Sequence, residues 1–129
     1  PFLDYRNTLE DRKLLIYGHN SQVVTTDFQF LENYLDISFF HEHPFFIWQT
    51  EESLDVYSIV GILVVTSDSL HMQLEFTDDE WRQHLEWLQE QFLYSTGVSL
   101  DEEDHLLILQ TCYYEPQDSY LLVVAKKNN

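Results

Sequence analysis

The chain has 129 residues and a formal net charge of −17, from 6 lysines and arginines and 23 aspartates and glutamates. This acidity excludes a nucleic-acid-binding protein, which needs a cationic surface, and it disfavours binding to anionic lipid headgroups. With 44% hydrophobic and 16% aromatic residues the chain is not disordered, and we expect residues 1–129 to form a single domain with one core.

The first two elements are a strand and a helix. The apolar run 14–17 is followed by residues 18–21, Gly-His-Asn-Ser, a pattern typical of a buried strand that ends in a turn. Phe28, Leu31 and Leu35 then recur with helical spacing. We therefore predict a short helix that begins at Asp27 and ends in the stretch 39–44.

A hairpin follows the helix. Residues 45–50 and 54–66 are rich in aromatic and β-branched side chains and predict two strands, joined by a turn at 51–53. Gly61 lies inside the second strand, where glycine indicates a bulge or a bend.

A second helix begins near Asp78. Thr77 and Glu80 have the spacing of a capping box, and the acidic residues in the first turn favour the helix dipole. One apolar face is predicted from Trp81, Leu85, Leu88 and Phe92, and Gly97 is the residue at which we expect the chain to leave the helix.

Two more strands, at 105–112 and 120–125, complete the chain. A polar loop with residues 115–118 joins them. The inventory predicts a mostly β fold with two helices, of the α+β class, and no repeat or linker divides the chain.

The sequence contains one cysteine, Cys112. One thiol excludes an intramolecular disulfide framework and a four-cysteine zinc site. His41 and His43 offer two imidazoles without further ligands, and the acidic run 101–104 lacks the spacing of an EF-hand, so we expect no metal site.

Cys112 has two interpretations at this stage. A free cysteine is most often a small buried side chain. At the end of a strand, however, a thiol is accessible to a substrate, and its thiolate is a strong nucleophile when a base or cation lowers its pKa. His19 also follows a strand, and a cysteine and a histidine need to be adjacent only in space.

Several short motifs resemble those of one enzyme family. Tyr17-Gly18-His19-Asn20 after one strand, and Thr111-Cys112 at the end of another, resemble the signatures of sortases, the cysteine transpeptidases of Gram-positive cell surfaces. Residues 2–7, the long helix before the final strand pair, and 94–98 leading into 104–106 resemble class B. The resemblance covers essentially the whole chain and implies a sortase-type β-barrel.

The chain departs from the family pattern after the cysteine. Sortases carry an arginine on the next strand that holds the substrate and stabilises the oxyanion, and at that spacing this chain has Tyr120, with Ser119 beside it. The arginines are Arg6, Arg12 and Arg82, all far upstream. Loss of one oxyanion donor typically costs about 10²–10³ in rate, so a slow enzyme and an impaired one are both compatible with the sequence.

The family fold also opens with an amino-terminal helix and strands that precede the position of Pro1. We therefore expect a barrel that is incomplete at its N-terminus, with residues 1–129 as its C-terminal portion. Unpaired strand edges are templates for association, so we expect strand exchange or an oligomer through the missing strands.

The resemblance implies a reaction. Cys112 attacks the carbonyl of a C-terminal sorting motif of a surface or pilin protein, and His19 protonates the departing amine. The thioacyl-enzyme then passes to an amine acceptor, either a pilin lysine or a cell-wall precursor, and no cofactor is implied. The acidic surface favours a lysine-bearing acceptor and hence pilin polymerisation.

The resemblance also implies a groove and a location. Thr66, His71, Met72 and Thr111 are the residues we expect to contact the sorting peptide. The enzyme is expected at the extracellular face of the plasma membrane, anchored by a segment outside this chain. Two alternatives remain: a sortase-like domain that binds sorting peptides or pilins without turnover, and a general Cys–His hydrolase.

Overall fold

The protein folds around a single mixed β-sheet. The computed structural model describes residues 2–18, 28–66, 70–114 and 118–128. The strands lie in the order β1-β2-β5-β6-β4-β3. Their bounds are Phe2–Leu3 (β1), Lys13–Tyr17 (β2), Phe45–Gln49 (β3), Leu54–Thr66 (β4), Leu106–Tyr113 (β5) and Ser119–Lys127 (β6). Every neighbouring pair is antiparallel except β2 and β5, which run parallel.

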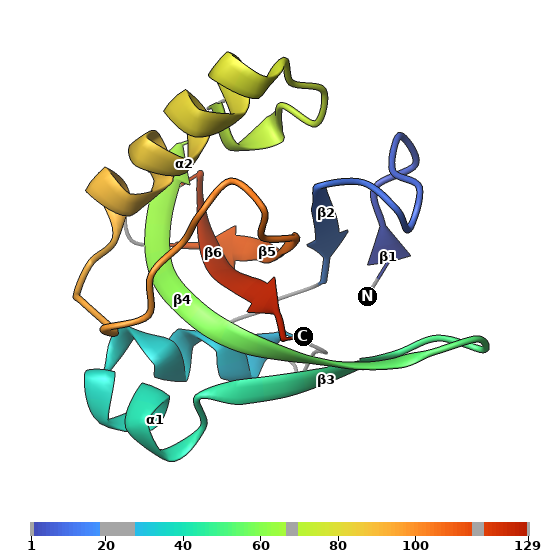
Figure 1. Ribbon diagram of the computed structural model, residues 1–129. Coiled ribbons are helices and arrows are strands. Elements are labelled where there is room, and N and C mark those ends of the chain that lie inside the picture. Colours follow the sequence, from blue (N-terminus) through green and yellow to red (C-terminus); the bar gives the residue numbers. More distant parts are fainter. Residues whose placement is uncertain (1, 19–27, 67–69, 115–117, 129) are drawn as a thin grey trace.

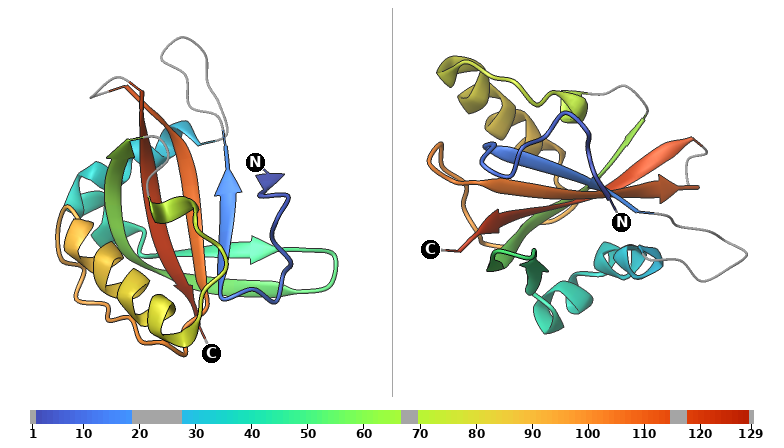
Figure 2. Two further views of the ribbon diagram at one scale, coloured as in Figure 1. Left: turned by 90° about the horizontal axis from the view of Figure 1, so that it is seen from above. Right: turned by 90° about the vertical axis from the view of Figure 1, so that its right-hand side faces the viewer.

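Helical segments cover both faces of this sheet. The helix α2 (Asp78–Gln91) and the 3-10 turn η2 (Leu70–Met72) lie over one face, while η1 (Gln29–Leu35) and α1 (Ile37–Glu42) lie over the other (Figure 2). The sheet is curled, most visibly along the long strand β4 (Figure 1). The mostly β fold with helices that the sequence predicted is confirmed.

Each face of the sheet has its own apolar core. Because successive side chains of a strand point to opposite faces, Leu107 and Leu109 of β5 pack in the cluster under η1 and α1. Leu106 and Ile108 pack in the cluster under α2. This alternation decides on which face each polar residue near the end of β5 lies.

The capping box of α2 is present. Thr77 Oγ1 accepts a hydrogen bond from the Glu80 backbone N–H at 3.2 Å, and Glu80 Oε1 accepts one from the Thr77 backbone N–H at 2.8 Å. The predicted helix end at Gly97 is wrong. The helix ends at Gln91, and Phe92 has an extended backbone (φ −60°, ψ 134°) that turns its ring toward the sheet.

The prediction of a bulge or bend at Gly61 is confirmed. The pairing of β4 with β6 shifts register between Ile59 and Gly61. A Cβ atom at position 61 would lie 2.4 Å from atoms of the Phe92 ring, so the close approach of that ring requires glycine.

The predicted first helix is two segments instead of one. Asp36 has an extended backbone (φ −95°, ψ 120°) between η1 and α1, and its side chain accepts a hydrogen bond from the Ser38 backbone N–H at 2.9 Å. This local cap begins a new helix and interrupts the helical pattern. The two-residue strand β1 has no counterpart among the predicted elements, because two residues are too short for a periodic signal.

Candidate active site

Cys112 lies at the end of β5 beside a pocket. Residues 106–111 of this strand are buried, whereas Cys112 is exposed. The pocket has a volume of about 360 Å³ and is lined by Phe2, Tyr17, Gly18, Gln110, Thr111, Cys112 and Tyr120. An accessible thiol at the edge of a sheet is positioned to act as a nucleophile.

The pocket combines two segments that are far apart in the sequence. Strand β2 runs parallel to β5, with Tyr17 opposite Gln110, so both strands end at the same edge. The backbone N–H of Gly18 donates to the Gln110 carbonyl at 3.0 Å and places Gly18 at the pocket wall. His19, the predicted partner of the thiol, lies outside the described residues.

Tyr120 lies directly opposite Cys112 in the antiparallel pair of β5 and β6. Both residues line the pocket, whose wall therefore carries a phenol at the position where the family pattern has an arginine. Thr111 also lines this pocket, although only 1% of the residue is exposed. Its Oγ1 atom has no hydrogen-bond partner among the described residues.

The other expected groove residues lie beside the pocket rather than in its lining. Thr66 is exposed at the end of β4, paired with Ser119 of β6. His71 is fully buried, and its Nε2 atom donates to Gln110 Oε1 at 3.0 Å. Met72 Sδ lies 3.9 Å from the Tyr17 hydroxyl oxygen. Thus η2 contacts the wall through Gln110 and Tyr17.

Tyr17 and Gln110 are wall residues that the sequence analysis did not single out. The Tyr17 hydroxyl donates to Asp4 Oδ2 at 2.5 Å, and Asp4 also accepts from Arg6 Nε at 3.0 Å. The hydrogen bond from Arg6 is the largest cause that lowers the pKa of Asp4 to about 2. Burial and the Asp4 carboxylate raise the pKa of Tyr17. The alternation of side chains along β5 is the signal that could have identified Gln110, two residues before the cysteine.

A buried basic cluster lies on the same face, beneath α2. Lys13, at the start of β2, is 0% exposed, and burial lowers the pKa of its amine to about 7, with a further contribution from the charge of Arg6. Its Nζ atom lies 2.9 Å from His84 Nε2. Burial, followed by the charges of Lys13 and His71, lowers the pKa of His84 to about 3.

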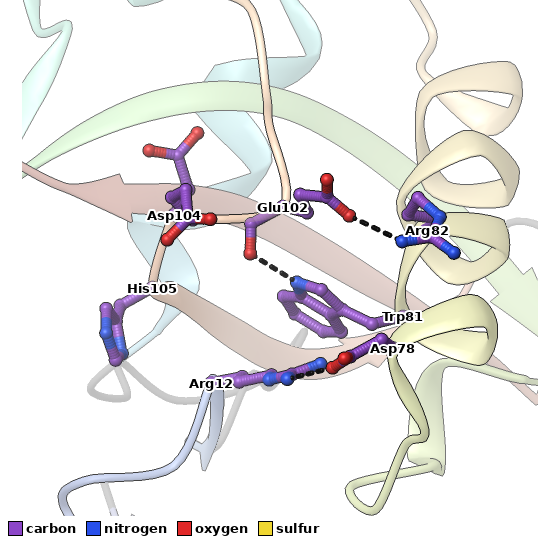
Figure 3. Close-up of a pocket in the computed structure, with 8 residues that line it drawn as sticks. Arg12, Asp78, Trp81, Arg82, Glu102, Asp104 and His105 are labelled. Atoms are coloured by element: carbon purple, nitrogen blue, oxygen red, sulfur yellow. Dashed lines mark hydrogen bonds and ion pairs between the residues drawn. The ribbon is translucent and has the colours of Figure 1, made fainter.

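A second pocket lies at the N-terminal end of α2 (Figure 3). Its volume is about 430 Å³. Arg12 forms an ion pair with Asp78 at 2.6 Å and lies over the Trp81 ring, 5.9 Å from its centroid. Arg82 pairs with Glu102 at 3.0 Å. These arginines tie α2 to neighbouring segments, and neither is among the residues that line the Cys112 pocket.

Two searches of the described residues returned no candidate. No group of three or more His, Cys, Asp and Glu side chains in the described part of the chain is arranged to hold a metal ion. Within the same residues, no helix has both the length and the apolar character required to cross a membrane.

Comparison with known proteins gives one consistent relationship. No family model matches the chain. Sortase B of Listeria monocytogenes serovar 1/2a (strain ATCC BAA-679 / EGD-e) is 31% identical over 114 residues, which cover 86% of this chain and 46% of that protein. The chain therefore spans less than half the length of this curated relative.

Solved structures of the same kind superpose closely. Sortase B from Listeria monocytogenes has a TM-score of 0.84 and 28% identity over 98% of this chain and 71% of that chain. Clostridium perfringens sortase B has a TM-score of 0.90 and 23% identity, over 99% of this chain and 72% of that one. The Staphylococcus aureus sortase B–substrate complex has a TM-score of 0.88 and 24% identity, over 99% and 61%.

These similarities extend over nearly the whole chain. The two matches with less than 25% identity show a shared fold, and the two Listeria matches add similarity in sequence. The curled six-stranded sheet is the sortase fold in a chain shorter than the solved sortases. The chain belongs to the sortase B family and spans part of the length of its members.

Proposed function

We propose that residues 1–129 form the C-terminal portion of a sortase catalytic domain, with Cys112 as the nucleophile of a transpeptidase. The observation that carries this proposal is the exposed thiol of Cys112, in a pocket at the shared end of β2 and β5, in a chain of the sortase B family. Gly18, the residue before His19, lines the same pocket and supports His19 as the partner of the thiol.

The reaction proceeds in two acyl transfers. The Cys112 sulfur forms a bond to the carbonyl carbon after the threonine of a sorting motif, and the C–N bond breaks as His19 gives a proton to the departing amine. In the second step an acceptor amine loses a proton to His19, attacks the thioester and releases the Cys112 sulfur. The division of one amide exchange into two acyl transfers is the general benefit of covalent catalysis.

Tyr120 supplies a donor to the oxyanion in this proposal. Its pairing with Cys112 brings a hydroxyl group to the same wall of the pocket. A phenol donates one hydrogen bond, whereas an arginine donates several and carries a charge. We therefore expect a slower acyl transfer than an arginine at this position would allow.

The substrates are peptides and amines. One sortase B has been solved with a substrate and another in complex with triglycine, which supports a groove for peptide chains near the cysteine. We propose sorting motifs of surface or pilin proteins as acyl donors, and Thr66, His71, Met72 and Thr111 as groove residues. The acceptor is a pilin lysine or a cell-wall precursor.

We favour pilin polymerisation among the acceptors. The net charge of −17 attracts a lysine-bearing acceptor. A sortase B from the type II pilus of Streptococcus pneumoniae has a similar fold, with a TM-score of 0.88. The enzyme acts at the cell surface in this proposal, anchored by a segment outside residues 1–129. Kinetics with a pilin acceptor that do not change with salt would contradict this preference.

A second candidate function is peptide binding without turnover. The observation that favours it is the position of the three arginines: none of them is among the described residues that line the Cys112 pocket. A domain of this kind binds sorting peptides or pilins and forms no thioester.

One experiment distinguishes these functions. The protein is incubated with sorting peptides, with and without an amine acceptor, and its intact mass is measured. A thioester on Cys112 that the amine resolves supports the transpeptidase, and Cys112→Ala, as the control, forms no adduct. Binding without an adduct supports the second candidate, and a thioester that water resolves as fast as the amine supports a Cys–His hydrolase.

A further inference from the structure

Lys13 is a buried lysine whose amine holds the turn η2. Its Nζ atom donates to the His71 backbone carbonyl at 2.6 Å. Arg6 donates to the next carbonyl, that of Met72, at 2.9 Å. Two cationic side chains from the first thirteen residues therefore bind consecutive carbonyls of η2 and fix its position over the sheet (Figure 2).

His71 passes this constraint on to the wall of the Cys112 pocket. Its backbone is held by Lys13, while its Nε2 atom donates to the side-chain oxygen of Gln110 at 3.0 Å. His71 is 0% exposed and Gln110 is 6% exposed, so water does not compete freely for this bond. The His71 ring also lies 6.3 Å from the Tyr120 ring, between centroids.

The bond from His71 orients the Gln110 amide. Once Oε1 accepts from His71, the NH₂ group is the end of the amide that remains to face the pocket. Gln110 precedes Cys112 by two residues, so both side chains lie on the α2 face of β5, and both line the pocket. An oriented amide N–H beside a thiol is a donor for an oxyanion that forms there.

We propose that Lys13 and His71 are positioning residues of the Cys112 pocket, which hold the Gln110 amide as a hydrogen-bond donor toward the reacting carbonyl. This inference rests on the proposed transpeptidase function and goes beyond it, because it assigns a second donor besides Tyr120. Lys13 touches no substrate and acts through His71, and His71 acts through Gln110.

The electrostatic surroundings of Lys13 suit a group that acts by position. The ionisable groups that face it are His71 from η2, His84 from α2 and Arg6 from the segment between β1 and β2. Their charges and the burial disfavour the ammonium form. An amine held in this way is a donor to the His71 carbonyl in either protonation state.

The test uses the single thiol as a reporter. The rate of Cys112 alkylation by iodoacetamide is measured by intact mass over a range of pH, well below each variant's melting temperature. His71→Leu removes the bond to Gln110 but leaves the carbonyl that Lys13 binds, and His71→Gln restores a donor. Lys13→Met removes the amine. Lys127→Met is the matched control, because Lys127 lies at the far end of β6 from Tyr120.

We expect His71→Leu and Lys13→Met to change the alkylation rate and its pH profile by about threefold or more, because the wall beside the thiolate is no longer fixed. His71→Gln and Lys127→Met should keep the original profile. Folded His71→Leu with the profile of the unchanged protein would overturn the proposal. If Lys13→Met does not fold, the comparison of His71→Leu with His71→Gln decides alone.

A second measurement separates this inference from the proposed function. With a sorting peptide, His71→Leu should lower kcat for thioester formation by about tenfold and change KM less, because the donor acts on the developing oxyanion. If the unchanged protein forms no thioester but its alkylation responds to His71→Leu, the proposed function fails and the positioning role stands. If thioester formation is efficient and indifferent to His71→Leu, the positioning role fails alone.

Discussion

Cys112 and Tyr120 lie directly opposite each other on β5 and β6, and both line one pocket. Directly paired residues of an antiparallel sheet have side chains on the same face and close together. A donor at position 120 is therefore correctly placed for a tetrahedral intermediate on the Cys112 sulfur. The chemical difference from the family pattern is a neutral phenol in place of a charged guanidinium.

Substitutions at Tyr120 test this difference. Tyr120→Phe should lower the rate of thioester formation by about 10²-fold, because it removes one oxyanion donor. Tyr120→Arg should raise the rate above that of the unchanged protein, since a guanidinium donates charge-assisted hydrogen bonds. Single-turnover intact-mass kinetics with a sorting peptide measure both. Equal rates for all three proteins would remove Tyr120 from the mechanism.

Lys13 gives the protein an alkaline dependence of stability. Its pKa is about 7 in the folded protein, against 10.5 for an ordinary lysine, so between these values the unfolded chain holds a proton that the folded chain lacks. The free energy of unfolding should then rise with pH, by up to about 2 kcal/mol between pH 7.5 and 9.5. Lys13→Met should lose this rise in urea denaturation, and Lys127→Met should keep it.

His84 gives a separate dependence on the acid side. Its pKa is about 3 in the folded protein, against 6.5 for an ordinary histidine, so the unfolded chain takes up the proton first as the pH falls. Stability is complete above pH 6.5 and should fall by up to about 2 kcal/mol between pH 6 and 4.5. His84→Gln should reduce this loss, and substitution of the exposed His105 by Gln should leave it unchanged. Equal acid sensitivity of the two variants would contradict the assignment.

Gly61 and Gly97 form a pair with different reasons for being glycine. Gly61→Ala places a Cβ against the Phe92 ring and should cost about 1–3 kcal/mol of stability by overpacking. Gly97 has a φ of +76° and open space around it, so Gly97→Ala should cost only about 1 kcal/mol of backbone strain. Urea denaturation measures both. In a Phe92→Leu background the cost at Gly61 should fall and the cost at Gly97 should not.

Elements governed by neighbours in sequence were predictable. The cap of α2 depends on Thr77 and Glu80, three residues apart, and the bend at Gly61 follows from the properties of glycine in a strand. The helix end at Gly97 was predicted wrongly because the ring of Phe92 packs on β4, a tertiary contact that no local pattern records.

The site was predictable to the same extent. The strand pattern placed Cys112 at a strand end, and the spacing to Tyr120 follows from the length of the hairpin loop. Lys13 gave no signal, because a lysine at the start of a strand is usually exposed. It is buried by His71 and His84, which lie 58 and 71 residues later in the chain. The role of His19 stays a prediction.

The parallel pairing of β2 with β5 has a consequence for folding. Strands β5 and β6 pair across a short loop, as do β3 and β4, whereas Tyr17 and Gln110 are joined by about 90 residues of intervening chain. The entropy of closing so long a loop is recovered only when both strands are buried on the two faces. The wall that contains Tyr17, Gly18 and Gln110 is therefore complete only in the globally folded molecule, and partial unfolding that releases β2 divides the pocket before it disturbs the β5–β6 pair.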